Sequence, residues 1–261
     1  MVKDLPNCFA EIEKWMSSHY LQLNAGKTEI IVCAKPDILA ELKIHGSFIT
    51  PSTCVRFVST AKNLGVLLDS QLTMTPQIKK LKKSCFNTMR KIACMKKFLT
   101  SSQCETLIHA LVFSSLDYCN SLYFGISSQN IKQLQMVQNR ACRIVLGLKK
   151  HQSVETHLQQ LHWLKVQERI EFKIVLLTFK CLNGLAPSYL SDLLQYNNLS
   201  GSRLPSLKGA SCHSSLGKRS FSLCAPQLWN NLPLQLKQCC DINVFKKQLK
   251  TTLFQKCYNL E

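Results

Sequence analysis

The sequence predicts an α+β fold that is mostly α-helical. Short β-branched segments such as Glu29–Ala34 predict strands within the first 70 residues. From residue 73 onward, apolar residues recur mainly at the three- and four-residue spacing of amphipathic helices. Residues 1–70 carry seven basic and seven acidic residues, whereas residues 71–150 carry thirteen basic and two acidic ones. We therefore expect three parts: residues 1–72, 73–150 and 151–261.

Composition indicates an ordinary folded protein with a strong positive charge. The chain has 261 residues, 46% hydrophobic content and a net charge of +18, which allows one large or two ordinary domains. Wholly apolar runs such as Ile174–Leu177 are far shorter than the roughly 18 residues that a membrane span needs. The first residues include acids and no apolar signal core, so no secretory peptide is expected. We expect an intracellular protein, in the nucleus or cytoplasm, with no membrane partner.

The fourteen cysteines are scattered, and no C-x-x-C motif occurs. Reduced core cysteines are favoured over a disulfide framework, because several occupy positions that suit a small hydrophobic side chain: Cys33, Cys85, Cys119, Cys142 and Cys181. The spacing of His151, His157 and His162 does not give metal-ligand geometry, and no nearby cysteine completes a zinc set. We expect no metal site and no cofactor in this chain.

The first part is expected to be one helix packed on a small antiparallel sheet. Asp4 can cap a helix over Asp4–Leu21 whose apolar face holds Phe9, Ile12, Met16 and Tyr20. Short β-branched or apolar segments then predict strands at Glu29–Ala34, Leu42–Ile44, Phe48–Thr50, Val55–Val58 and Leu64–Leu68.

The strongest single element is an amphipathic helix over Thr75–Leu99, with Thr75 as its cap. One face, an arc of roughly 120°, is apolar and holds Ile78, Leu81, Cys85, Met89, Ile92, Met95 and Leu99. The other side carries Lys79, Lys83, Arg90 and Lys97, with no acidic residue between Gln71 and Gln103. A row of one sign costs self-repulsion, which favours a polyanionic partner such as nucleic acid. A solvated face and a membrane surface are the alternatives.

Two further helices complete an expected three-helix bundle. The first spans Ser102–Tyr123, with Ser102 and Glu105 as a capping box. The second is expected to be capped by Ser128 and to end near Gly147, and its outer face holds Lys132, Arg140 and Arg143. Arg140 and Arg143 are candidate phosphate contacts, although a solvated face is an equal alternative.

The last part is expected to be helical with one flexible loop. Val166–Asn183 reads as an apolar helix stopped by Gly184, and a short helix follows over Ser188–Leu194. Residues 197–222 are rich in serine, glycine and basic residues, which indicates a long loop. A final helix, Asp241–Phe254, is expected to bury Val244, Phe245, Leu249 and Leu253.

Several short motifs follow one another in an order that resembles a known family. They are Leu23–Glu29, Leu64–Asp69, Leu116–Leu122, Leu134–Asn139, Leu161–Leu164, Ala225–Pro233 and Phe245–Phe254. In this order they resemble the end of the palm, the thumb and the C-terminal region of LINE-type (non-LTR retrotransposon) reverse transcriptases of the jockey-like branch. Each motif is weak alone, but together they cover nearly the whole chain.

The resemblance implies roles for particular residues. Residues 1–72 would be the end of the palm, and residues 73–150 the thumb, which lies against the template–primer duplex and reads its backbone. Lys27 matches a lysine that contacts the incoming triphosphate or its leaving group, with an ordinary turn lysine as the alternative. Leu64, Gly65 and Val66 match the primer-grip hairpin, with an ordinary strand glycine as the alternative. RNA or an RNA–DNA duplex is the implied partner.

The family's catalytic Ala-Asp-Asp turn is not found in this chain. Polymerase chemistry needs clustered carboxylates for two Mg²⁺ ions, but the six aspartates are widely separated in sequence. The resemblance places the catalytic turn, with its Mg²⁺, upstream of residue 1. We therefore expect a truncated reverse transcriptase that binds a template–primer duplex, joins its missing N-terminal half and does not polymerise alone. A non-catalytic nucleic-acid-binding protein and a non-functional translated remnant are the alternatives.

Overall fold

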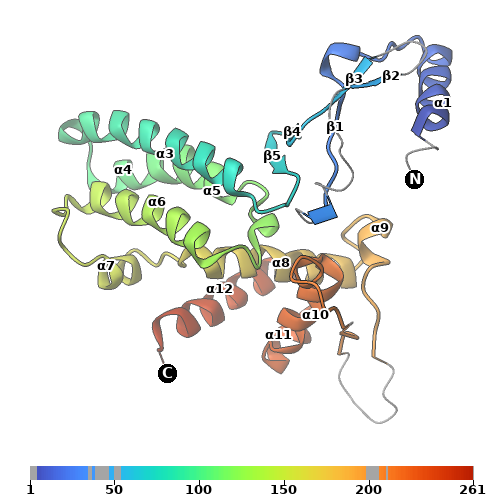
Figure 1. Ribbon diagram of the computed structural model, residues 1–261. Coiled ribbons are helices and arrows are strands. Elements are labelled where there is room, and N and C mark those ends of the chain that lie inside the picture. Colours follow the sequence, from blue (N-terminus) through green and yellow to red (C-terminus); the bar gives the residue numbers. More distant parts are fainter. Residues whose placement is uncertain are drawn as a thin grey trace. The chain divides into compact units, whose positions relative to one another are not determined.

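The computed structural model describes residues 5–34, 37–38, 47–49, 54–197, 206–209 and 211–260. The chain divides into two units, residues 1–77 (unit 1) and residues 78–261 (unit 2). Helices make up most of the described residues, and the strands all lie in unit 1 apart from one isolated bridge (Figure 1). The expected α+β class with a majority of helix is confirmed.

Unit 1 begins with helix α1 (Leu5–Ser18), and none of its residues from Asn7 onward is buried. Ile12 is 42% exposed, and Tyr20 lies beyond the helix with a positive φ of 57° and 99% exposure. The expected inward face is therefore wrong at these two positions. Asp4, the expected cap, lies outside the described residues.

The main sheet of unit 1 is mixed, not antiparallel as expected. Strand β1 (Glu29–Ile30) pairs in parallel with the central β3 (Cys54–Phe57), and β2 (Ser47–Ile49) pairs antiparallel with β3. A parallel partner needs a long connection, which the residues between β1 and β3 provide. The strand expected at 42–44 lies outside the described residues.

A separate hairpin joins β4 (Thr60–Asn63) to β5 (Val66–Asp69) through a two-residue turn. The turn residues Leu64 and Gly65 have φ angles of 45° and 88°. Two positive φ angles define the turn type whose twist matches the flanking strands. The strand expected over Leu64–Leu68 is therefore shorter at its start, and the strand β4 was not predicted.

The side chains of Asp69 and Thr73 accept hydrogen bonds from the backbone of the segment that leads into helix α3 (Thr75–Met95). Asp69 accepts hydrogen bonds from the backbone N–H of Met74 (2.8 Å) and of Thr73 (2.9 Å). Thr73 Oγ1 in turn accepts from the Thr75 N–H at 3.2 Å. Thr75 was expected to be the cap, but it is the first residue of the helix, and Asp69 and Thr73 supply these acceptors.

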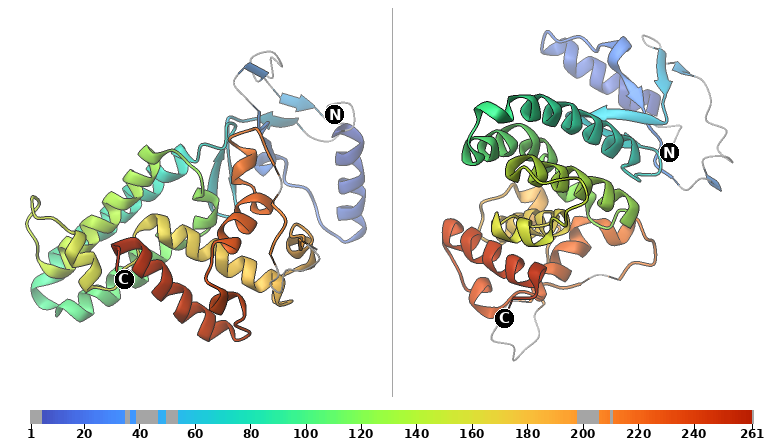
Figure 2. Two further views of the ribbon diagram at one scale, coloured as in Figure 1. Left: turned by 90° about the horizontal axis from the view of Figure 1, so that it is seen from below. Right: turned by 90° about the vertical axis from the view of Figure 1, so that its left-hand side faces the viewer.

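The first half of unit 2 consists of helices that run alongside one another (Figures 1 and 2). Helix α3 is followed by the 3₁₀ segment η2 (Lys96–Phe98), α4 (Ser101–Ile108), the single π-helical turn η3 (His109–Phe113) and α5 (Ser114–Asp117). The 3₁₀ segment η4 (Asn120–Tyr123) and α6 (Ser128–Leu146) come next. Helix α3 ends at Met95, where η2 follows, and is therefore shorter than expected; Met95, expected on the apolar face, is 45% exposed, and the buried stripe stops at Ile92.

The helix expected over 102–123 differs at both ends. Its cap is Thr100, whose Oγ1 accepts from the Gln103 N–H while Gln103 Oε1 accepts from the Thr100 N–H. Glu105, expected to complete the capping box, instead accepts a hydrogen bond from Trp163 Nε1 at 3.0 Å. At the other end, the helix stops at Asp117, because Tyr118 is extended with φ of −65° and ψ of 117°, and Cys119 then adopts a left-handed conformation before η4.

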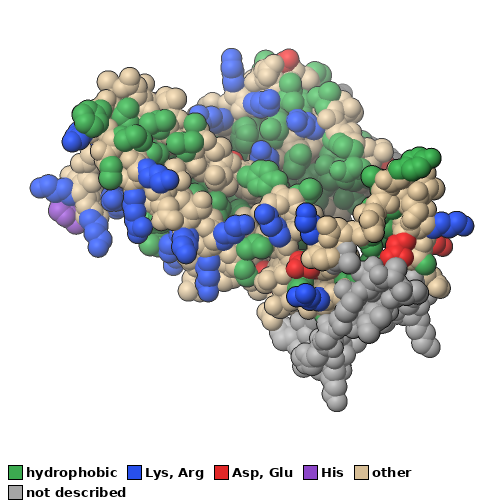
Figure 3. Space-filling model, turned by 90° about the horizontal axis from the view of Figure 1, so that it is seen from above, with side chains coloured by type: hydrophobic (Ala, Val, Ile, Leu, Met, Phe, Trp, Pro, Cys, Tyr) green, Lys and Arg blue, Asp and Glu red, His purple; other side chains and the backbone are tan. Residues whose placement is uncertain are grey.

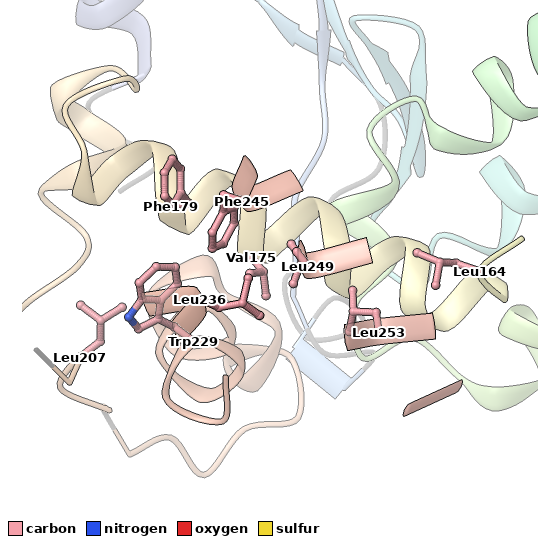
Figure 4. Packing of buried hydrophobic residues seen from close by; sticks show 9 residues of the cluster. All are labelled: Leu164, Val175, Phe179, Leu207, Trp229, Leu236, Phe245, Leu249 and Leu253. Carbon is pink, nitrogen blue, oxygen red and sulfur yellow. The ribbon is translucent and has the colours of Figure 1, made fainter. Parts of the chain in front are cut away.

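The second half of unit 2 is built around helix α8 (Val166–Leu182), which contacts α6, η4, α10 and α12. The remaining elements are α7 (Glu155–Gln160), α9 (Ser188–Ser191), η5 (Gly217–Arg219), α10 (Phe221–Asn230), α11 (Leu234–Lys237) and α12 (Ile242–Tyr258). Figure 4 shows the aromatic centre of the core between these helices, where Phe179, Trp229 and Phe245 lie together.

Two expectations for this half differ from the structure at single residues. Leu207, within the stretch 197–222 expected to be a flexible loop, is 1% exposed and belongs to the core shown in Figure 4. Its backbone exchanges hydrogen bonds with the Asn230 side chain at 2.8 and 2.9 Å. Val244, expected to be buried, is 45% exposed, while Phe245, Leu249 and Leu253 are buried as expected.

Candidate nucleic-acid interface

Helices α3 and α6 form the walls of a groove of about 500 Å³, which we call the basic groove. Four cationic side chains line it: Arg90 from α3, Arg140 and Arg143 from α6, and Lys150 from the segment after α6. The other lining side chains are Phe86, Met89, Met136 and Asn139, and no acidic residue lines the groove.

Amphipathic packing explains why these cations lie at the rim of the groove. Helix α3 buries the stripe that contains Ile78, Cys85 and Met89, and α6 buries Leu134 and Ala141. Because the buried stripe of each helix faces the interior, the residues next to it stand on the flanks and border the gap between the helices. Arginine and lysine are suited to this place because their long stems cover apolar surface while their charges stay in water.

The hydrogen bonds of these side chains leave positive charge available in the groove. Arg143 Nη2 donates to the backbone oxygen of Gln152 (3.1 Å), and its buried Nε donates to no group in the described chain. Arg90 Nη1 donates to Asn87 Oδ1 at 3.3 Å, which is a neutral acceptor. The ion pairs among the described residues involve His109, Lys165, Arg169 and Lys256, and none of the four groove cations.

The structure brings together half of the six nucleic-acid-binding residues predicted from the sequence. Arg90, Arg140 and Arg143 line the basic groove, whereas Lys79, Lys83 and Lys97 do not. Lys79 and Lys83 are exposed near the start of α3. Lys97 is also exposed, but it lies in η2 beyond the end of the helix, with its Nζ 4.8 Å from the centre of the Phe98 ring.

Sequence reasoning missed Lys150 and the exposed apolar side chain of Met136, which is 51% exposed at the groove. The signal for Lys150 was its position in a pair with Lys149, shortly after Gly147, which caps the end of α6. Figure 3 shows Lys and Arg side chains along the arm that carries α3, at the left of the picture, while the visible acidic side chains lie elsewhere.

The remaining predicted site residues belong to unit 1. Lys27 is exposed in the 3₁₀ segment η1 (Ala25–Lys27), and its N–H donates to the Asn24 oxygen at 3.0 Å. Leu64 and Gly65 form the turn between β4 and β5, where Leu64 is 83% exposed, and Val66 is 3% exposed at the start of β5.

Thirteen of the fourteen cysteines have described side chains and are free thiols, but not all of these lie in the core. Burial raises the pKa of Cys85, Cys142 and Cys224 to about 11. Cys33, expected to be buried, is exposed, and Cys119 is half-buried. Within the described ranges, no three histidine, cysteine, aspartate or glutamate side chains come together as metal ligands.

Helices in the described part of the chain are too short or too polar to cross a membrane. Comparison with models of protein families, with curated proteins and with solved structures found no match to this chain.

Proposed function

We propose that this protein binds nucleic acid through the basic groove between α3 and α6. The observation that carries this proposal is the convergence of Arg90, Arg140, Arg143 and Lys150 around one groove that no acidic residue lines. These cations come from segments far apart in sequence, so the density of charge is a property of the folded chain.

The chemistry of the groove favours phosphate groups as the ligand. Arginine presents a planar set of donors that matches two phosphate oxygens, and three of the four groove cations are arginines. Binding would release counterions from the phosphate backbone, and this release supplies most of the affinity of proteins that read no sequence. Phe86 and Met136 offer apolar contact surface between the charges.

The ligand that we propose is an RNA–DNA or RNA duplex, of the kind that a polymerase holds as template and primer. The order of motifs that resembles LINE-type reverse transcriptases supports this choice, because the matching part of that family is a thumb. Contacts to phosphate and sugar position a duplex without reading its bases. We further propose that the chain does not extend a primer by itself, because its six aspartates are dispersed along the sequence. Under this proposal, the polymerase half that carries the carboxylates and Mg²⁺ is a partner.

A second candidate is a nucleic-acid-binding protein with no role in polymerisation. One observation favours it: every residue that lines the basic groove belongs to unit 2. Binding through this groove therefore requires no residue of unit 1.

The proposal is tested by adding the purified protein to a labelled RNA–DNA hybrid at low salt, with nucleotides and Mg²⁺ in the same tube. We expect salt-sensitive binding without primer extension. Absence of binding at low salt would contradict the proposed function and favour a non-functional remnant. Primer extension would contradict the inference from the dispersed aspartates. Adding a polymerase half with an intact Ala-Asp-Asp turn then separates the two candidates, because only a polymerase thumb should raise its activity.

A further inference from the structure

A second hollow in unit 2, separate from the basic groove, has the features of a binding site for a small ligand. Its volume is about 190 Å³, and we call it the Asn120 cavity. It lies where η4, the segment before α8, α8 itself and α12 meet. The side chains that line it include Asn120, Trp163, Lys173 and Lys250.

Asn120 supplies a hydrogen-bond acceptor that the described chain does not use. The residue is 3% exposed, and its Nδ2 donates weakly to Asp117 Oδ1 (3.3 Å) and to the Arg169 backbone oxygen (3.4 Å). Because both of these partners are acceptors, they determine which side of the amide is nitrogen. The buried Oδ1 accepts no hydrogen bond from the described residues. A buried acceptor of this kind gains from a ligand that brings an O–H or N–H group.

The charge around the cavity is positive. The carboxylate of Asp117 is engaged by Arg169, whose Nε donates to Oδ1 at 2.9 Å and whose Nη2 donates to Oδ2. Lys173 of α8 and Lys250 of α12 also line the cavity, and neither forms an ion pair with a described residue. Two unpaired ammonium groups at one hollow favour an anion.

We propose that the Asn120 cavity binds a small phosphomonoester that carries hydroxyl groups, such as a sugar phosphate. The phosphate contacts Lys173 and Lys250, and a hydroxyl of the ligand donates to Asn120 Oδ1. Trp163 and Phe172 give the carbon skeleton an apolar wall. The volume of about 190 Å³ admits a phosphate with a small organic group, so of an oligonucleotide only the phosphorylated end could enter. The same chemistry has two sources, a free metabolite and the phosphorylated end of an RNA.

Calorimetric titration of the full chain at pH 8 tests this proposal with three probes: ribose 5-phosphate, methyl phosphate and ribose. Methyl phosphate has the charge but no hydroxyl donor, and ribose has the hydroxyl groups but no charge. We expect ribose 5-phosphate to bind about tenfold more tightly than methyl phosphate, the difference that one hydrogen bond to a buried acceptor produces. Ribose should not bind measurably.

The variants separate the two contacts. Lys173→Gln with Lys250→Gln should weaken both phosphates about tenfold or more, while Lys247→Gln, an exposed change on α12 outside the cavity, should leave both unchanged. Asn120→Ala should remove the preference for ribose 5-phosphate over methyl phosphate. Should this variant not fold, the comparison of probes on the unmodified protein still tests the acceptor.

Equal affinity for the two phosphates would overturn the role of Asn120. No binding of ribose 5-phosphate at millimolar concentration, or unchanged binding by the lysine variant, would overturn the site itself. Competition by a 5′-phosphorylated tetranucleotide assigns the source, since only an RNA-end site would be blocked by it. None of these results depends on the basic groove, so the two proposals fail independently.

Discussion

Lys96 donates a hydrogen bond from its Nζ to the backbone oxygen of Val145 at 2.8 Å. The bond joins η2, which follows α3, to the last turn of α6. The last carbonyl groups of a helix have no partner within it and carry partial negative charge, so a lysine is a favourable donor there. Lys96 thereby connects the ends of the two helices whose side chains line the basic groove.

Replacing Lys96 should therefore destabilise unit 2. We expect Lys96→Met to lower the free energy of unfolding by about 1–2 kcal/mol, because it removes a charged hydrogen bond from the backbone carbonyl of Val145, a buried residue. Lys91→Met, a change at an exposed residue of α3, is the matched control and should have little effect. Urea unfolding measures both. Equal stability of the two variants would mean that the Lys96 bond contributes nothing.

The cations that line the basic groove should contribute more to nucleic-acid affinity than the other cations of the row on α3. Arg90→Gln with Arg140→Gln should weaken binding of an RNA–DNA hybrid by about tenfold, because it removes two of four converging charges. Lys79→Gln with Lys83→Gln removes the same charge from exposed positions outside the groove and should cost roughly threefold or less. Fluorescence anisotropy at a fixed salt concentration compares the pairs. A larger loss for Lys79 and Lys83 would place the nucleic acid along the start of α3 instead.

The ion pair between Asp117 and Arg169 should contribute to the stability of unit 2. Their side chains are 33% and 17% exposed, and Arg169 also lies 4.7 Å from the centre of the Phe113 ring. A double-mutant cycle with Asp117→Asn and Arg169→Gln should give a coupling energy of about 1–2 kcal/mol, reduced from a buried pair by the partial exposure.

The matched comparison is the pair between Glu155 and Lys165, which is more exposed on the acidic side. The hydrogen bond that Lys165 donates lowers the pKa of Glu155. The contribution of this pair to the free energy of unfolding is therefore present above the ordinary pKa of 4.5 and disappears as the pH falls through the lowered pKa. We expect a clearly smaller coupling for this pair in the same cycle at pH 7. Equal couplings would show that burial does not strengthen the Asp117–Arg169 pair.

Thiol reactivity should separate one cysteine from the buried ones. A hydrogen bond from Ser214 lowers the pKa of Cys212, whereas burial holds Cys85, Cys142 and Cys224 near 11 against an ordinary value of 9.0. At pH 8, iodoacetamide should therefore modify Cys212 first, and the three buried thiols only after unfolding, as read by mass spectrometry. Modification of a buried thiol as fast as Cys212 in the folded protein would contradict this assignment.

The same raised pKa values predict the direction of alkaline destabilisation. Above pH 9 the unfolded chain releases these thiol protons, while the folded chain keeps them until about pH 11. The free energy of unfolding should thus fall as the pH rises from 9 to 11, by up to about 1.4 kcal/mol per buried thiol and pH unit. Replacing Cys142 by alanine should make that fall less steep.

The long helices could be predicted from the sequence because their burial follows one spacing. Ile78, Leu81, Cys85, Met89 and Ile92 repeat at helical intervals and are all buried in α3. Helix α8 was expected over Val166–Asn183, within one residue of its observed bounds, because Gly184 takes the positive φ that ends it.

What could not be predicted depends on contacts between distant parts of the chain. The capping box was assigned to Ser102 and Glu105, but Glu105 is engaged by Trp163, 58 residues away. Leu207 stands in a polar stretch that resembles a loop, yet Asn230 holds its backbone in the core. For the candidate site, the helical wheel identified Arg90 and Arg140 as outward-facing cations. It could not show that α3 and α6 place them at one groove with Lys150.

The salt dependence of binding tests the central claim most directly. A groove variant carries Arg90→Gln, Arg140→Gln and Lys150→Gln, and a control variant of equal charge carries Lys208→Gln, Lys246→Gln and Lys247→Gln, all outside the groove. Each phosphate contact contributes about 0.9 to the slope of the logarithm of the binding constant against the logarithm of the salt concentration. We predict that the groove variant loses about two to three units of slope on an RNA–DNA hybrid, while the control variant keeps the slope of the unmodified protein. Equal slopes for the two variants would contradict binding through the basic groove.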